Sequence, residues 1–409
     1  MKILIVNKFL FPKGGSETYI IKLGEELVKQ GHDVQYFGMD SPKRCLENNC
    51  NSYVSYIDFH KGSILNKLFY LFKTIYSVEA RNKIRKVLDD FKPDVVHLNN
   101  FTYQLTPSII LEIVKWRKLN KRNCKILFTA HDSNLVCPNH MLYIPHKHQR
   151  CRKCLGGKFY NCALNKCIHG SLLKSILGSI EGYFWNIKKS YKYIDTIICC
   201  SNFMKQIYDT NNLFKNKTVV LHNFIDYNNI DPTTIKKQDF VLYFGRYSQE
   251  KGISTLVDVC KSLPNIKFFF AGEGPLETEI NKCKNITNVG FKMGDDLIKL
   301  IQQAKFSVYP SEWYENCPFS VMESVVNGTP VIASNIGGIP ELLKDKFNSE
   351  LFDAENKDQL KQKIQNLYGQ QDLLQSYILN AQKTEYLSIA NYVFNLVKLY
   401  SKALYKYVS

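Results

Sequence analysis

The apolar residues of this chain fall into short runs that alternate with helical patterns, and this alternation predicts a parallel α/β fold. The first apolar run covers residues 2–7 and is followed by a glycine loop, Lys13-Gly14-Gly15-Ser16. Apolar residues at helical spacing come next and stop at Gly31, before a second apolar run at 32–38. Strand, helix and strand in this order make the βαβ unit of a parallel sheet.

Further buried strands are predicted in both halves of the chain. In the first half they lie at 94–98, 125–131, 195–201 and 218–223. The polar stretch 223–239 has no apolar periodicity, and we interpret it as an interdomain linker. In the second half strands are predicted at 240–245, 266–272, 286–291, 306–311 and 330–334, and residues 386–409 look like a closing helix. Ligands of such sheets bind outside the carboxyl ends of the strands, so we expect a cleft between two facing halves.

The composition is that of a globular chain of two domains. The chain also has a large positive net charge, which indicates an anionic binding partner. The chain has 409 residues, of which 45% are hydrophobic, and a formal net charge of +17. Such a charge suits nucleic acid, an anionic membrane or phosphorylated substrates. The basic residues are spread out and form no known nucleic-acid-binding signature, so we expect no nucleic-acid partner. Without a secretory signal or an apolar run of about 18 residues, we expect a cytoplasmic protein whose 13 cysteines are reduced.

Charged and glycine residues follow two strands of the second half. Gly245-Arg246 ends one strand, and Lys251 comes five residues later. Glycine lets backbone approach a ligand, and the two cations could embrace a diphosphate. A charged surface loop is the plainer alternative. After the next strand, Gly272 begins a Gly-x-Gly turn, but Pro275 follows, so the dinucleotide fingerprint is absent and a nicotinamide or flavin enzyme is disfavoured.

Two glutamates with seven residues between them, Glu315 and Glu323, follow the strand at 306–311. Pro318 fits the first turn of a helix, which places Glu315 in the loop and Glu323 about one turn inside. A helix long enough to hold both would set them ~80° apart on one side. The free amides around Phe319 and Ser320 would face the cleft and attract phosphate. A single first-turn glutamate favoured by the helix dipole remains an alternative for either acid.

Taken together, these motifs resemble the retaining glycosyltransferases of family 4, which have the GT-B fold. The resemblance rests on Glu315-Asn316-Cys317-Pro318 through Glu323, Gly245-Arg246 with Lys251-Gly252, the turn at 271–275, Gly14-Gly15-Ser16-Glu17 and Thr129-Ala130-His131-Asp132. It covers nearly the whole chain. It implies two facing Rossmann-like domains, 1–225 on the acceptor side and 226–385 on the nucleotide-sugar side, with a deep cleft between them. The C-terminal helix 386–409 would return to the first domain.

The resemblance also implies roles for the site residues. Arg246 and Lys251 would hold the donor diphosphate and offset the leaving-group charge, so that no metal cofactor is required for catalysis. Glu323 would bind the ribose hydroxyls, and Glu315 would touch the donor sugar near its reacting carbon. Gly14 and Gly15, together with the second-half turn at Gly272 and the amides of Phe319 and Ser320, would complete the donor site.

On the first domain, His131 would lie under the donor sugar, next to Glu315 as the second catalytic candidate. The alternative for His131 is a strand-end histidine bonded to backbone. His97 and Asn99 end another strand and are candidates for the acceptor pocket. Retention could come from front-face attack, with a donor phosphate oxygen as base, or from a covalent intermediate, and the sequence leaves both open.

A cysteine-rich insertion at 137–170 follows this strand end. Cys151 and Cys154 form a C-x2-C pair, and Cys162 and Cys167 follow, so four thiolates could hold a structural zinc ion. Reduced cysteines used as small apolar side chains are the alternative. The insertion resembles the cysteine-rich inserts of those family members that are associated with surface polysaccharides.

Two further segments, 60–86 and 171–193, mix aromatic and aliphatic residues with lysines and arginines. They predict basic amphipathic helices, which commonly pack against a core with a solvated face. The net charge favours peripheral binding to the anionic inner face of the cell membrane, where lipid-linked acceptors lie. We therefore expect a retaining glycosyltransferase that moves a sugar from a nucleotide-sugar donor to a lipid-linked glycan in surface polysaccharide synthesis. The alternatives are another GT-B activity, such as an epimerase or phosphorylase, or a non-catalytic nucleotide-sugar or zinc-binding scaffold.

Overall fold

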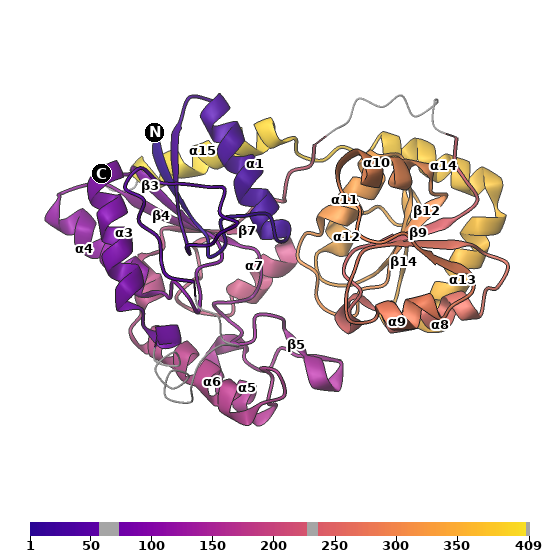
Figure 1. Ribbon diagram of the computed structural model, residues 1–409, viewed down its shortest axis with the longest axis horizontal. Coiled ribbons are helices and arrows are strands. Elements are labelled where there is room, and N and C mark those ends of the chain that lie inside the picture. Colours follow the sequence, from indigo (N-terminus) through magenta and orange to yellow (C-terminus); the bar gives the residue numbers. More distant parts are fainter. Residues whose placement is uncertain (57–72, 227–235, 406–409) are drawn as a thin grey trace.

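The computed structural model describes residues 1–56, 73–226 and 236–405, and it shows two α/β domains that face each other (Figure 1). Each domain contains a six-stranded sheet in which every strand pair is parallel. Parallel strands are buried on both faces and therefore appear in the sequence as continuous apolar runs. Every strand predicted from such a run is present.

The first sheet has the strand order β2-β1-β3-β4-β7-β8. Its strands are β1 Lys2–Val6, β2 Asp33–Phe37, β3 Val95–Leu98, β4 Lys125–Ala130, β7 Thr196–Cys199 and β8 Thr218–Val220. The crossover helices are α1 Gly15–Lys29, α3 Val78–Phe91, α4 Ser108–Leu119, α6 Leu172–Ile187 and α7 Asn202–Tyr208. The strand order reverses between β1 and β3, so a crevice opens there at the carboxyl ends of the strands.

The second sheet has the order β11-β10-β9-β12-β13-β14 and reverses between β9 and β12. Its strands are β9 Val241–Phe244, β10 Phe268–Ala271, β11 Ile286–Asn288, β12 Phe306–Tyr309, β13 Val331–Ser334 and β14 Ser349–Phe352. Its helices are α8 Ile253–Lys261, α9 Glu277–Asn281, α10 Gly294–Gln303, α11 Phe319–Val326, α12 Ile339–Leu342, α13 Lys357–Gly369 and α14 Gln371–Gln382. The edge strand β14 was not predicted, because its short sequence, SELF, contains only two apolar residues.

The C-terminal helix α15, Ile389–Tyr405, leaves the second domain and packs on α1 and β4 of the first (Figure 1). Tyr392 on α15 exchanges a 2.7 Å hydrogen bond with Tyr19 on α1, and both side chains are fully buried. The chain therefore crosses between the domains twice. Most of the predicted linker, residues 227–235, lies outside the described part.

The cysteine-rich insertion forms a small unit beside the cleft. It contains a hairpin of β5 Tyr143–Ile144 and β6 Gln149–Arg150, followed by the short helix α5 Tyr160–Leu164, which packs on α6. Of the predicted basic helices, the second corresponds to α6. The first does not form one helix: residues 60–72 lie outside the described part, and Ser77 caps a separate helix, α3, whose apolar face is buried. None of the described helices has the length and apolar run of a membrane-spanning segment.

Candidate active site

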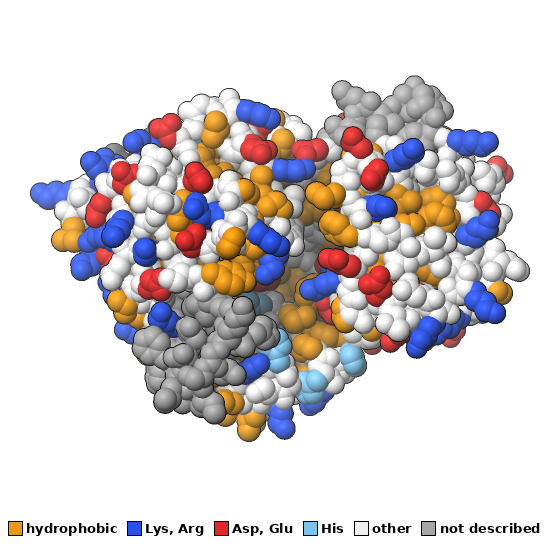
Figure 2. All heavy atoms as spheres, in the orientation of Figure 1, with side chains coloured by type: hydrophobic (Ala, Val, Ile, Leu, Met, Phe, Trp, Pro, Cys, Tyr) orange, Lys and Arg blue, Asp and Glu red, His pale blue; other side chains and the backbone are white. Residues whose placement is uncertain are grey.

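A cavity of about 360 Å³ lies between the two domains, where the carboxyl ends of both sheets face each other. The space-filling view shows the cleft between the two halves, with histidine side chains close to its lower end (Figure 2). Residues of both domains line the cavity: Gly15, Ser16, His131, Asp132, Ser133, His140, Met141, Leu142, Met204, Asn223, Lys251, Trp313, Tyr314, Glu315, Asn316, Cys317, Pro318, Phe319, Ser320 and Glu323. This is the place where parallel sheets bind ligands.

Glu315 is a buried carboxylate held by three donors. Lys251 Nζ lies 2.6 Å from its Oε1, Ser311 Oγ donates to the same oxygen at 2.6 Å, and Trp313 Nε1 donates to it at 2.8 Å. Burial alone would raise the pKa of Glu315. The Lys251 charge and these hydrogen bonds outweigh burial and hold the pKa below its ordinary value. Glu315 is therefore an anion at neutral pH.

Lys251 reaches Glu315 because the loops after β9 and β12 touch. Gly252 follows Lys251 with φ +72°, and a Cβ there would lie 1.9 Å from the carbonyl oxygen of Pro310. Only glycine fits this crossing, since both the space and the left-handed backbone exclude a side chain. Gly252 thus joins the two loops that carry Lys251 and Glu315.

Arg246 does not join Lys251 in the cavity. Its side chain is 57% exposed and pairs with Glu250 four residues later. An exposed pair of this kind is weak. The predicted embrace of a diphosphate by both cations is therefore not formed in this arrangement, and Arg246 would have to leave Glu250 to take part.

Glu323 lies in the second turn of α11, and its side chain reaches the cavity. Burial raises the pKa of Glu323, an effect that Lys22 reduces, and no hydrogen bond or ion pair to this carboxylate is found among the described residues. Because α11 begins at Phe319, Glu315 is in the loop, and the alternative in which one helix holds both acids is wrong. The residue before α11, Pro318, makes no side-chain capping bond, and Phe319 and Ser320 line the cavity. The first amides of this helix are available to an anion.

The three predicted donor glycines differ in position. Gly15 lines the cavity, and a Cβ on it would lie 3.6 Å from the Phe319 ring of the other domain. Gly14 precedes the first turn of α1 and does not reach the cavity. Gly272 packs against the loop that follows β9 instead, because a Cβ on it would lie 2.0 Å from the carbonyl oxygen of Gly245. Its role in the structure is close packing of two loops.

His131 follows β4 and lines the cavity, with its ring edge-on to Tyr19 at 4.7 Å between centroids. Its Nε2 lies 2.9 Å from Oδ1 of Asn99. The Asn99 amide nitrogen faces the carbonyl oxygens of Val6 and His97, so Oδ1 is the atom turned to the imidazole. Burial lowers the pKa of His131 to about 3, and the neutral ring therefore donates from Nε2 and keeps a lone pair on Nδ1.

The structure does not place His97 or Asn99, the predicted acceptor residues, in the lining of the cavity. His97 is fully buried, with Nδ1 2.7 Å from the hydroxyl of Tyr400 and Nε2 2.7 Å from that of Thr129. Asn99 is also fully buried and orients His131. His97 is the third residue of β3 and points to the face covered by α15, a contact across 303 positions of sequence.

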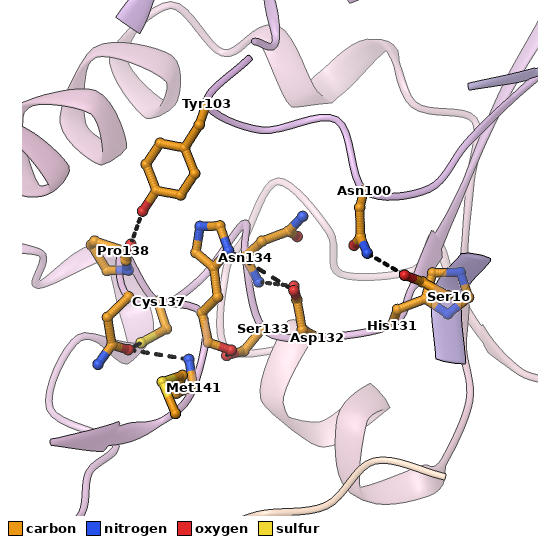
Figure 3. A network of polar contacts seen from close by, with 12 residues as sticks. Ser16, Asn100, Tyr103, His131, Asp132, Ser133, Asn134, Cys137, Pro138 and Met141 are labelled. Atoms are coloured by element: carbon orange, nitrogen blue, oxygen red, sulfur yellow. Dashed lines mark hydrogen bonds and ion pairs between the residues drawn. The ribbon is translucent and has the colours of Figure 1, made fainter. Parts of the chain in front are cut away.

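Asp132 and His140 occupy the first-domain wall of the cavity instead. Figure 3 shows Asp132 beside Asn134. Oδ1 of Asp132 accepts the amide of Asn134 at 2.9 Å, and its Oδ2 lies 3.9 Å from Nδ1 of His140. Burial raises the pKa of Asp132 to about 6, against the opposing charge of Lys8. The His140 ring stacks on Tyr103 with 4.8 Å between centroids. The strand-end motif contained Asp132, but its contact with the insertion is tertiary and has no local signal.

Asn316, next to Glu315, ties the two domains together. Its amide nitrogen donates to the carbonyl oxygens of Ala130 at 2.8 Å and His131 at 3.2 Å, and its Oδ1 accepts from Ser201 at 2.8 Å. The motif that carries Glu315 is thus bonded directly to the ends of β4 and β7. Its backbone is held from the other side, where the amide of Gly338 donates to the carbonyl oxygen of Glu315 at 2.8 Å.

The cysteines of the insertion gather around one small void. Five of them, together with Asn139 and Tyr143, line a space of about 10 Å³: Cys137, Cys151, Cys154, Cys162 and Cys167. The amide of Lys153 donates to Sγ of Cys151 at 3.5 Å. Among the described residues, no group of three or more His, Cys, Asp or Glu side chains is arranged to hold a metal ion. The thiols converge without forming a coordination sphere, and the zinc expectation stays a prediction.

Two facing parallel-sheet domains with a shared cavity and a returning C-terminal helix define the GT-B class of glycosyltransferases. The family model for Glycosyltransferase Family 4 matches residues 13–229, and that for Glycosyl transferases group 1 matches residues 227–384. The first match covers more than half of the chain, so the chain belongs to Glycosyltransferase Family 4. The two ranges meet close to the predicted boundary between residues 225 and 226.

Individual proteins show the same likeness. An uncharacterized 42.6 kDa protein in the cps region of Klebsiella pneumoniae is 24% identical over 84% of this chain and 87% of its own length. A sucrose-phosphate synthase of Thermosynechococcus elongatus superposes with a TM-score of 0.69, at 18% identity over 98% of both chains. The Anabaena protein HepE, solved in complex with UDP and glucose, gives a TM-score of 0.64 at 15% identity, over 98% of this chain and 100% of its own. The structural matches establish the GT-B fold.

Proposed function

We propose that this protein transfers a sugar from a nucleotide-sugar donor to a glycan acceptor with retention of the anomeric configuration. One observation carries the proposal: Lys251, Glu315, Glu323 and the uncapped start of α11 meet in one cavity with His131. A cation and the amides at a helix start suit a diphosphate, and a carboxylate that has no partner in the described part of the chain suits sugar hydroxyls. The Anabaena protein with UDP and glucose supports a donor of this chemical class.

The donor would lie across the second domain. Lys251 and the first amides of α11 would bind the diphosphate, with Arg246 joining after it leaves Glu250. Glu323, whose carboxylate has no hydrogen-bond or ion-pair partner among the described residues, could bind the ribose hydroxyls. The donor sugar would then lie between Glu315 and His131, the two residues that approach from opposite domains. This arrangement puts positive charge where the leaving group develops negative charge.

Glu315 would act by charge and position. Its Oε1 already accepts three hydrogen bonds, and its pKa is below the ordinary value, so it is a weak base. These contacts support front-face attack, in which an oxygen of the leaving phosphate removes the proton of the acceptor hydroxyl. The glutamate would stabilise the positive charge that forms on the donor sugar.

The acceptor would be a lipid-linked glycan in the synthesis of a surface polysaccharide. Its support is the relative in the Klebsiella cps region and the basic first domain. The first-domain wall of the cavity, formed by Asp132, His140 and Met141, is the side from which a glycan could enter.

A turnover assay with a panel of nucleotide sugars tests the proposal. Donors are first ranked by the rise in melting temperature, since a ligand of the native state stabilises it. The best donor is then incubated with and without membrane glycolipids. We expect nucleotide release that depends on the acceptor, and a product with the anomeric configuration of the donor. Binding without any turnover would favour a scaffold, an inverted product would exclude retention, and interconversion of nucleotide sugars or dependence on inorganic phosphate would favour an epimerase or a phosphorylase.

A further inference from the structure

Helix α6 turns its apolar side to solvent. Five of its large apolar residues are exposed: Leu172 at 51%, Leu173 at 63%, Ile176 at 38%, Ile180 at 49% and Ile187 at 77%. At about 100° per residue they fall within an arc of about 100° on one face, which we name the α6 apolar face. The opposite face is buried and consists largely of small or polar residues: Ser175, Gly178, Ser179, Glu181 and Trp185.

The buried face explains why α6 can sit this way. A Cβ on Gly178 would lie 2.5 Å from Ile168, and one on Gly182 would lie 3.0 Å from the Phe159 ring. The insertion therefore packs closely on the small residues of α6, and Ser179 Oγ donates to the carbonyl oxygen of Phe159 at 2.8 Å. The face of α6 with small residues is buried against the insertion, and its apolar face is left exposed to solvent. A row of exposed aliphatic side chains on one helix face marks an interaction site.

The segment that contains this face carries exposed charges of one sign. Residues 137–194 contain ten Lys and Arg residues and one acid, Glu181. Glu181 is buried, whereas the lysines at 158, 166, 174, 188, 189 and 192 are exposed. A second copy of the chain would bring equal positive charges together. An anionic lipid surface offers both an apolar layer and negative charge.

We propose that the α6 apolar face, with the lysines around it, is the surface by which this protein docks on an anionic lipid bilayer. The inference rests on the proposed function, because docking on the bilayer would bring the cavity close to a lipid-linked acceptor. α6 packs on Pro138, and His140, Met141 and Leu142 of the same unit line the cavity. In Figure 1, α5 and α6 lie at the lower edge of the first domain, with β5 between them and the second domain. Docking through α6 would hold the first-domain wall of the cavity close to the membrane.

Vesicle co-sedimentation of the full chain tests the surface. We expect binding to phosphatidylcholine vesicles that contain phosphatidylglycerol, and at least tenfold weaker binding to pure phosphatidylcholine. The double variant Leu173→Glu/Ile180→Glu should bind the anionic vesicles at least tenfold less than the wild type, because it places two carboxylates in the apolar face. Its matched control is Val28→Glu/Leu119→Glu, since these residues are 57% and 65% exposed on other helices of the first domain. The control should bind like the wild type.

Any of three vesicle results would overturn the proposal: no binding of the wild type to anionic vesicles, equal loss in both double variants, or wild-type binding by Leu173→Glu/Ile180→Glu. A wild-type dimer that this variant converts to a monomer would assign the face to a second copy instead. Transfer to a short, soluble glycan is measured in parallel. The α6 variant should keep that activity, so a failure of docking is distinct from a failure of the proposed transfer reaction.

Discussion

The ammonium of Lys251 lies 2.6 Å from Oε1 of Glu315, and this buried ion pair joins the two loops at the switch point of the second sheet. Its side chains are 19% and 7% exposed. Neither partner can be removed without leaving the other in a site with little water. The two side chains that would contact the donor therefore also stabilise the protein when no donor is bound.

Replacement of Lys251 by Met should damage stability and activity together. The change leaves the Glu315 carboxylate buried without its cation, which should lower the free energy of unfolding by about 3 kcal/mol. Chemical denaturation of the ligand-free protein measures this loss, and steady-state kinetics should show that kcat/KM falls at least ~100-fold. An unchanged unfolding free energy would contradict the role of the pair.

Arg246→Met is the matched comparison, because Arg246 is exposed and its ion pair within the described residues is with Glu250. The unfolding free energy should change by less than ~1 kcal/mol. If Arg246 leaves Glu250 to bind the diphosphate, the KM for the donor should rise about tenfold. A donor KM equal to the wild-type value would assign the diphosphate to Lys251 and the α11 amides alone.

Glu315→Gln should separate charge from shape. Glutamine keeps an oxygen that can accept from Ser311 and Trp313 but removes the negative charge next to the donor sugar. We expect kcat to fall about 100-fold while the KM for the donor stays within about threefold, because the lost interaction acts in the transition state. Initial rates at saturating acceptor measure both constants. A rise of donor KM at constant kcat would show instead that Glu315 only binds.

Glu323→Ala should have the opposite kinetic signature. Loss of charged hydrogen bonds to ribose should weaken donor binding about 10- to 100-fold. The ligand-free protein should be as stable as the wild type or more stable, since burial raises the pKa of this acid and it has no partner among the described residues. Isothermal titration with the donor and a thermal melt without it give the two readouts. Unchanged donor affinity would remove Glu323 from the site.

The sequence predicted the sheets well because parallel strands are buried on both faces. Every residue of β12 and β13, for example, is buried, and both strands appear in the sequence as largely apolar runs. β14 escaped because it lies at the sheet edge and carries Glu350, which pairs with Lys363 and Tyr377. Local pattern therefore determines the interior strands, and an edge strand with a charged residue is ambiguous.

Strand-end chemistry in the sequence picked out residues that the structure brings to one cavity, but it could not show contacts made with distant segments. Lys251, Glu315 and Glu323 occupy the switch point that the strand order creates. His97 also ends a strand, but it lies outside the cavity lining because its side chain bonds Tyr400 of α15. Nor could spacing show that Asn316 bonds the ends of β4, or that Asp132 meets His140 of the insertion.

The cysteine cluster predicts the metal content of the purified protein. We propose that it binds one zinc ion, because five thiols line one void and the C-x2-C loop already donates an amide to Cys151. The side chains would have to rotate about χ1 to coordinate it, since no coordinating group is present among the described residues. Elemental analysis of reduced protein, purified without chelators, should give about one zinc per chain.

The matched variants are Cys154→Ser and Cys260→Ser. Both cysteines are buried, but Cys260 lies in α8 of the second domain, away from the cluster. The first change should remove the metal and lower the melting temperature, and the second should leave the metal content unchanged. Protein without zinc, and with the same stability before and after chelation, would establish that the cysteines serve as small apolar side chains.

Glu181 on α6, which does not line the cavity, gives a pH-dependent prediction. Its Oε1 is buried and has no hydrogen-bond partner among the described residues, and burial raises its pKa to about 8. An unfolded glutamate has a pKa near ~4.3, so the folded state binds the proton more tightly. The stability that this proton provides is complete below the unfolded pKa and is lost as the pH rises through the folded pKa.

Glu181→Gln removes the titration while keeping the shape of the side chain. The unfolding free energy of the variant minus that of the wild type should therefore rise with pH by about 1.4 kcal/mol per unit, or about 4 kcal/mol between pH 5 and 8. Other titrating groups, such as Lys237, cancel in this difference because both proteins contain them. Denaturation curves at pH 5, 6, 7 and 8 measure it, and a difference that stays constant would mean that Glu181 is ionised in the folded protein and finds a partner there.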